Sequence, residues 1–159
     1  MQIQLMPKHS ETRHSPYSPE QLHAMVLDVM RYPEFLPWCR AARILQKEPE
    51  YFVAELVISF KNFTERYTSK ITIPLIENGL AINVDLVSGP FKHLSNHWQF
   101  EPAPERGTHI HFAVDFAFKS RILDGLIGAL FSRATEKMTR AFLNRADVLY
   151  GAPTKIDNP

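Results

Sequence analysis

The residues of this 159-residue chain that could most directly perform chemistry are two histidines, His109 and His111. An i, i+2 spacing on a strand places two imidazoles on the same face, where they can share a metal ion. Asp115 falls on that face further along, and no cysteine is near. Because the alternation of the segment turns this face toward solvent, we interpret the three residues as surface polar groups and predict no metal site.

Acid–base catalysis needs titratable side chains that converge in a protected place. The apolar faces of the predicted strands hold few such groups, and their polar or half-polar members are Tyr67, Ser69, Asn96 and Trp98. The six glycines are spread along the chain and form no phosphate-binding loop. We therefore predict no catalytic residues. The interior could be built for an apolar ligand, or it could be a core filled by its own Phe and Leu side chains.

The elements that would position these residues are mainly strands. A first strand is expected around residues 8–14, and five further segments between residues 51 and 118 alternate apolar and polar residues with a period of two. The clearest apolar face is made of Ile110, Phe112, Val114, Phe116 and Phe118. One dry face repeated along consecutive strands is typical of an antiparallel sheet that is covered on one side only.

Two helices are predicted from their start signals. Ser18 is followed by a proline and, three residues after the cap, by Gln21, and Pro33 and Pro37 end or interrupt the helical pattern that follows. A second helix is expected from Ser120 to about residue 150, with Gly151 as a left-handed cap.

This last helix has an apolar stripe and a partly basic outer surface formed by Arg133, Lys137, Arg140 and Arg145. A single helix can cover the dry face of so many strands only if the sheet bends around it. Gly125 and Gly128 leave little side-chain volume near its first turns, so we expect an opening there.

Composition limits the class of protein. The formal charge of +1 argues against nucleic-acid binding driven by bulk charge, and we predict no DNA partner. Cys39 is the only cysteine, so no internal disulfide can form. We expect a single domain over residues 1–151 with a frayed tail at 152–159, in a cytoplasmic protein that has peripheral membrane contact at most.

Three runs of residues resemble one known family. They are similar to motifs of the coenzyme Q-binding START-domain family. The runs are Tyr32-Pro33 with Phe35-Leu36-Pro37-Trp38-Cys39, then Gly89-Pro90-Phe91 followed by Trp98, and Asp115-Phe116-Ala117-Phe118-Lys119-Ser120-Arg121. Together they cover nearly the whole chain. The same family includes the RatA bacterial toxins, which act on ribosomes.

The resemblance implies an α+β helix-grip fold of the START/Bet v 1-like kind, a curved antiparallel sheet wrapped around the C-terminal helix. It also implies that the protein binds a polyprenyl quinone such as ubiquinone without catalysis, and that it binds no other cofactor. In this role the protein would be a carrier or chaperone that supports respiration. The ribosome-associated toxin is the alternative that the same resemblance implies, with the large ribosomal subunit as the partner.

The predicted ligand-binding side chains are large and apolar. They are Phe35, Leu36, Phe60, Tyr67, Leu86, Phe91, Trp98, Phe112, Phe116, Leu126, Ile127 and Leu130. Tyr67, Ser69 and Asn96 are the candidates for contacting a polar headgroup. The turns at residues 35–38 and 89–91 could be pocket rims or membrane-touching tips, or loop residues tucked into the core.

Overall fold

The computed structural model describes residues 8–60 and 63–151, without the side chains of residues 8, 123 and 126–132. Its strands are β1 (Lys8–Ser15), β2 (Cys39–Lys47), β3 (Tyr51–Phe60), β4 (Phe63–Thr72), β5 (Leu80–Ser88), β6 (Phe91–Pro102) and β7 (Thr108–Phe118). Its helices are α1 (Pro19–Leu27), the 3₁₀ helix η1 (Val29–Glu34), α2 (Arg121–Ala146) and the π-helical turn η2 (Asp147–Gly151).

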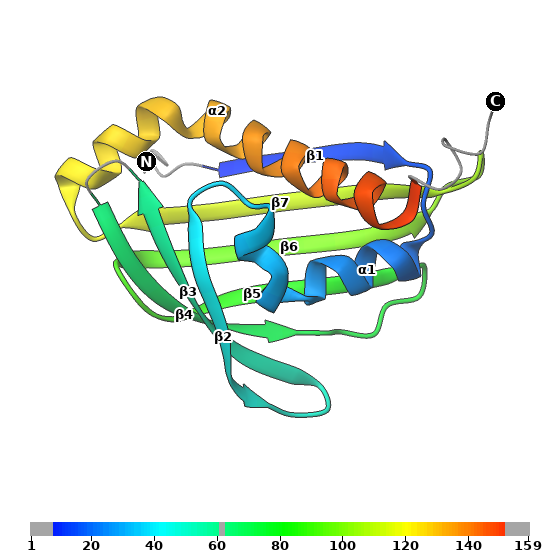
Figure 1. Ribbon diagram of the computed structural model, residues 1–159, viewed down its shortest axis with the longest axis horizontal. Helices are drawn as coiled ribbons and strands as arrows, with labels where there is room; N and C mark the ends of the chain where they lie inside the picture. Colours follow the sequence, from blue (N-terminus) through cyan, green and yellow to red (C-terminus); the bar gives the residue numbers. More distant parts are fainter. Residues whose placement is uncertain (1–7, 61–62, 152–159) are drawn as a thin grey trace, which may run out of the picture.

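The seven strands form one antiparallel sheet in the order β1-β7-β6-β5-β4-β3-β2. Both helices lie on the same face of this sheet, and β2 to β4 turn away from the direction of β6 and β7 (Figure 1). Register shifts in β2, between β4 and β5, and in β6 accompany this bending. The predicted helix-grip arrangement is therefore confirmed.

The first helix begins as its sequence predicts. The Ser18 hydroxyl accepts a hydrogen bond from the Gln21 amide at 3.1 Å, and the Gln21 side chain accepts one from the Ser18 amide at 3.0 Å. The helix ends at Leu27, before either proline, and Pro33 lies inside η1. The break that we expected at the prolines therefore comes earlier, at the C-cap Asp28.

Strand β2 is not among the strands predicted from the sequence. It pairs with β3 at the edge of the sheet, and most of its side chains are exposed. An edge strand with little buried surface carries only a weak alternating pattern, because few of its positions need to be apolar. Its first residue, Cys39, is nevertheless buried.

The end of the last helix differs from the prediction. Gly151 does not have a positive φ, so it is not a left-handed cap. Its backbone instead lies against Tyr17, whose hydroxyl would be 2.3 Å from a Cβ at this position. A larger residue here would displace the Tyr17 hydroxyl, which donates a hydrogen bond to Asp147 Oδ1 at 2.6 Å. Within the described ranges, no helix is long and apolar enough to cross a membrane. The tail predicted to fray, residues 152–159, lies outside the described residues.

Candidate functional site

A cavity of about 540 Å³ lies between the concave face of the sheet and the helices. This volume is within the ~300–1,000 Å³ range of small-molecule sites. Side chains from β3 to β7 form its floor, and α1, η1 and α2 contribute its other walls. The cavity reaches the surface, because the exposed residues Arg133 and Lys137 are part of its lining.

Most of the predicted ligand-binding residues meet at this cavity. Those that line it are Leu36, Phe60, Tyr67, Phe91, Trp98, Phe112 and Phe116. Leu126, Ile127 and Leu130 belong to α2, but their side chains lie outside the described residues. Gly125 is exposed and does not line the cavity, so the opening expected near the first turns of α2 stays a prediction.

Two predicted residues do not line the cavity. The Phe35 ring packs edge-on against Phe142 and Tyr32, with centroid distances of 5.4 and 5.9 Å, so it belongs to the core. Leu86 pairs with Ser69 directly after a register shift between β4 and β5, and it is half-buried outside the cavity lining. Strand periodicity alone cannot reveal such a shift.

Many lining residues were not among the predicted ligand-binding residues, including Tyr32, Trp38 and Cys39. All three lie in the run from Tyr32 to Cys39 that resembles the family signature, so that run was the available signal. Trp38 has a φ of 68°, which is unusual for a bulky residue, and its ring stands edge-on to Phe60 at 5.6 Å. The Trp38 carbonyl accepts a hydrogen bond from the Ser59 amide at 2.8 Å, which fixes this turn to β3.

The polar groups of the cavity differ in their partners. Asn96 Nδ2 donates to the Ala113 carbonyl at 2.8 Å, and its Oδ1 accepts from Trp98 Nε1 at 2.9 Å. The hydroxyls of Tyr67 and Ser69 also belong to the lining, and they have no hydrogen-bond partner among the described residues. Two hydrogen-bonding groups are thus available to a ligand inside an otherwise apolar space.

Burial keeps the tyrosine and cysteine groups of the cavity neutral. Desolvation raises the pKa of the Tyr67 hydroxyl above its usual range, and it does the same to the pKa of Tyr32. Burial also raises the pKa of the Cys39 thiol to about 11. The three groups are therefore protonated at neutral pH, and the thiol is a poor nucleophile.

The basic residues of α2 divide into two pairs. Arg140 and Arg145 bind Glu136 and Glu34, with N–O distances of 2.9 and 2.8 Å. Arg133 and Lys137, one helical turn apart, line the cavity and have no carboxylate partner in the described part of the chain. The expected basic outer surface is therefore partly neutralised, and two of its charges lie at the cavity rim.

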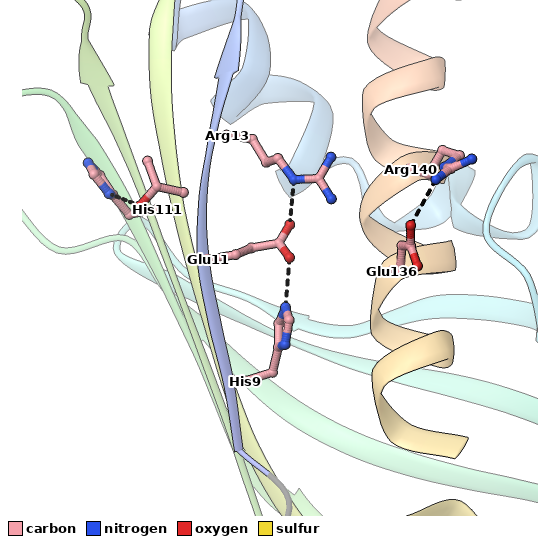
Figure 2. A network of polar contacts seen from close by, with 7 residues as sticks. His9, Glu11, Arg13, His111, Glu136 and Arg140 are labelled. Carbon is pink, nitrogen blue, oxygen red and sulfur yellow. Dashed lines mark hydrogen bonds and ion pairs between the residues drawn. The ribbon is translucent and has the colours of Figure 1, made fainter. Parts of the chain in front are cut away.

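A second polar cluster lies on the inner face of β1. Glu11 Oε1 is 2.7 Å from His9 Nε2, and Glu11 Oε2 is 3.1 Å from Arg13 Nε. Figure 2 shows these side chains on the side of β1 that faces α2, with His111 pointing away from them. Glu11 and Arg13 border a second cavity of only about 20 Å³.

The histidines that suggested a metal site pair with carboxylates instead. His111 Nε2 is 2.8 Å from Glu101, and His109 Nε2 is 3.1 Å from Glu105. Asp115 is paired with His93 at 2.9 Å. Among the described residues, no three His, Cys, Asp or Glu side chains are grouped so that they could hold a metal ion.

Comparison with curated proteins identifies close relatives. A protein from Rickettsia prowazekii named ribosome association toxin RatA is 43% identical over 85% of this chain and 92% of its own length. The Xenopus laevis mitochondrial coenzyme Q-binding protein COQ10 homolog B is 32% identical over 91% of this chain and 59% of its own length.

Solved structures share the fold. A START superfamily protein from Mycobacterium smegmatis superposes with a TM-score of 0.75 at 18% identity, and covers 89% of this chain and 98% of its own. The Zhui aromatase/cyclase from Streptomyces sp. R1128 gives a TM-score of 0.75 at 16% identity, with coverage of 89% and 94%. The family model for polyketide cyclase / dehydrase and lipid transport matches residues 15–143, and the chain belongs to this RatA-like family of START proteins.

Proposed function

We propose that the protein binds an apolar ligand in the large cavity, without catalysis, and that this ligand is a polyprenyl quinone such as ubiquinone. The observation that carries the proposal is an open, mainly apolar cavity of about 540 Å³ in a domain of ordinary size. An engineered cavity that is dry and apolar binds apolar guests in the same way. The lipid-transport description of the family and the name of the COQ10 relative both favour this ligand class.

The size of the cavity limits how the ligand can bind. A methylene group occupies about as much space as a water molecule, ~30 Å³, so the cavity holds roughly 18 such groups. A long polyprenyl tail would therefore extend through the opening. Each methylene taken from water contributes ~0.8 kcal/mol, whereas a methylene taken from a bilayer contributes little. The protein would thus exchange its ligand with a membrane as a carrier or chaperone, working in the cytoplasm beside the membrane.

Intrinsic fluorescence offers a direct test. The chain has two tryptophans, and both Trp38 and Trp98 line the cavity. We expect a short-chain ubiquinone to quench their emission with a saturable dependence on concentration. Solvent extraction of protein purified from quinone-rich cells should also yield quinone. Absence of both signals would count against the proposal.

A cavity-filling variant provides the matched experiment. Ala54 is 1% exposed and lines the cavity on β3, so Ala54→Phe would place a ring in the ligand's space. We expect the variant to remain folded and to lose at least ten-fold in quinone affinity. Ala41→Phe, at an exposed position on the neighbouring strand β2, is the control and should bind as the wild type does.

Ribosome association is a second candidate, favoured by the 43% identity to a protein named ribosome association toxin RatA. We would test it by co-sedimentation with large ribosomal subunits across a range of salt concentrations. Contacts to phosphate weaken steeply as salt rises, so specific association should fall with a clear salt slope. If Ala54→Phe co-sediments normally but does not bind quinone, the two activities are separate.

A further inference from the structure

The inner face of β4 carries two hydroxyls that the fold leaves unpaired. Ser69 is only 3% exposed, and Tyr67 lies two residues before it on the same face. Both residues line the large cavity, and neither hydroxyl has a hydrogen-bond partner within residues 8–60 and 63–151. Neither oxygen is completely enclosed by protein atoms either, so both hydroxyls reach into the open space.

Unpaired polar groups are uncommon inside proteins. More than about nine in ten buried polar groups have a hydrogen-bond partner, because an unmade bond in a dry environment costs free energy. Asn96 in the same cavity follows that rule, since the Ala113 carbonyl and Trp98 satisfy its amide. The hydroxyls of Tyr67 and Ser69 face the open cavity without such a partner, so they can take one from outside the chain.

The position of Tyr67 is well supported by its surroundings. The Phe91 ring stands edge-on to the Tyr67 ring at 5.3 Å. Gly89 has a φ of +149°, and a Cβ there would be 2.5 Å from the Tyr67 Cβ. Only glycine allows this close approach, so the turn between β5 and β6 packs against the Tyr67 backbone and Cβ.

The charge of the surroundings defines the kind of ligand group. Of the described residues that line the cavity, Arg133 and Lys137 are the charged ones, and both are exposed on α2. Ser69 is 3% exposed whereas both cations are exposed to solvent, so a carboxylate or phosphate at Ser69 would be buried away from water while its possible counter-ions remain hydrated, which is unfavourable. Burial holds the Tyr67 pKa above its usual range, so this hydroxyl keeps its proton and can donate it in a hydrogen bond.

We infer that Tyr67 and Ser69 form a subsite for a neutral group that accepts hydrogen bonds, as a ring carbonyl does, with the apolar remainder of the ligand along the other walls. This inference rests on the proposed binding function and adds the chemical class of the headgroup. It predicts that the protein distinguishes a quinone from a hydrocarbon of the same size.

The test compares two probes on three proteins. The probes are a short-chain ubiquinone and an alkylbenzene with a tail of equal length and no oxygen, and binding is measured by calorimetry. The proteins are the wild type, the double variant Tyr67→Phe/Ser69→Ala and the control Tyr51→Phe. Tyr51 is a suitable control because its hydroxyl already has a partner, Gln46 Nε2 at 3.2 Å, outside the cavity lining.

We expect the double variant to bind the quinone about ten-fold more weakly and the alkylbenzene as well as the wild type does. Its melting temperature should be unchanged or higher, because the hydroxyls make no internal hydrogen bond. Tyr51→Phe should bind both probes normally. Equal losses for both probes, or a lower melting temperature of the double variant, would overturn the subsite and leave the cavity function standing. If the wild type binds neither probe, the proposed function fails and the subsite with it.

Discussion

Two polar clusters on the same face of one sheet differ in how their groups are paired. On β1, Glu11 lies between His9 and Arg13, at 2.7 and 3.1 Å, and the cavity beside them is about 20 Å³. On β4, the hydroxyls of Tyr67 and Ser69 have no partner among the described residues, and the cavity before them is about 540 Å³. Ion-paired side chains therefore border the small cavity, although Glu11 Oε2 makes no hydrogen bond among the described residues. The two hydroxyls without any partner lie where the fold stays open.

Phe142 on α2 lies between the two regions, because its side chain lines both cavities. Its ring packs edge-on against Trp98 at 5.1 Å, so this pair separates the closed region from the open one. The difference between the closed region and the open one therefore depends on a few large side chains as well as on the polar groups. Substitutions can remove the boundary or test each side of it.

Phe142→Ala should have the largest effect, since it removes a ring that is 7% exposed. Loss of such a core ring costs about 3–5 kcal/mol in unfolding free energy, and the two cavities would merge. Urea unfolding would measure the loss. We also expect the variant to accept a bulkier quinone than the wild type does. Phe142→Leu, which keeps the barrier, is the control, and a loss below about 1 kcal/mol for Phe142→Ala would contradict the proposed boundary.

The reactivity of the Cys39 thiol measures how well the open region excludes water. Its thiol pKa is raised from 9.0 to about 11, so the reactive thiolate at pH 8 should be roughly 100-fold rarer than in the unfolded chain. Alkylation should be slow in the native protein, faster in urea, and slower still with quinone bound. Because the folded state holds this proton more tightly, the stability that it contributes is complete below pH 9 and is lost as pH rises through about 11. A native rate equal to that in urea would exclude burial of the thiol.

Glu11→Gln tests the closed region with a smaller change. The Glu11 side chain is 17% exposed and holds two partners, so losing its charge should cost about 1–2 kcal/mol in chemical unfolding. Figure 2 includes a suitable control, Glu136, which pairs with Arg140 at the surface of α2. Glu136→Gln should cost about 0.5 kcal/mol or less. Quinone binding should stay within two-fold in both variants, and a larger change in Glu11→Gln would mean that the β1 cluster belongs to the binding site.

The inward faces of the strands could be predicted because their period is short and local. Phe112 and Phe116 on β7, and Tyr67 and Ser69 on β4, line the cavity as the alternation indicated. A hydrophobic face has the same pattern whether it meets a ligand or another side chain. For that reason the pattern could place Tyr67 on the inside but could not show that its hydroxyl is unpaired.

Other features depend on contacts between distant segments. Phe35 looked like a rim residue, but Phe142, more than a hundred residues away in sequence, takes it into the core. Gly151 looked like a left-handed helix cap, but it has no positive φ and lies against the Tyr17 hydroxyl. The inward position of Glu11 follows from the pairing of β1 with β7, where Glu11 is opposite Phe112. A single sequence does not specify such pairings.

A domain with an interior space of about 540 Å³ gives up packing that a solid core would have. Under the proposed function, the occupant would restore those contacts and slow unfolding. At a free ligand concentration 100 times its dissociation constant, binding adds about 2.7 kcal/mol to stability. The amount of protein that survives proteolysis in the cell would then follow the supply of its lipid. Starvation for that lipid would shorten the lifetime of the protein before its rate of synthesis changed.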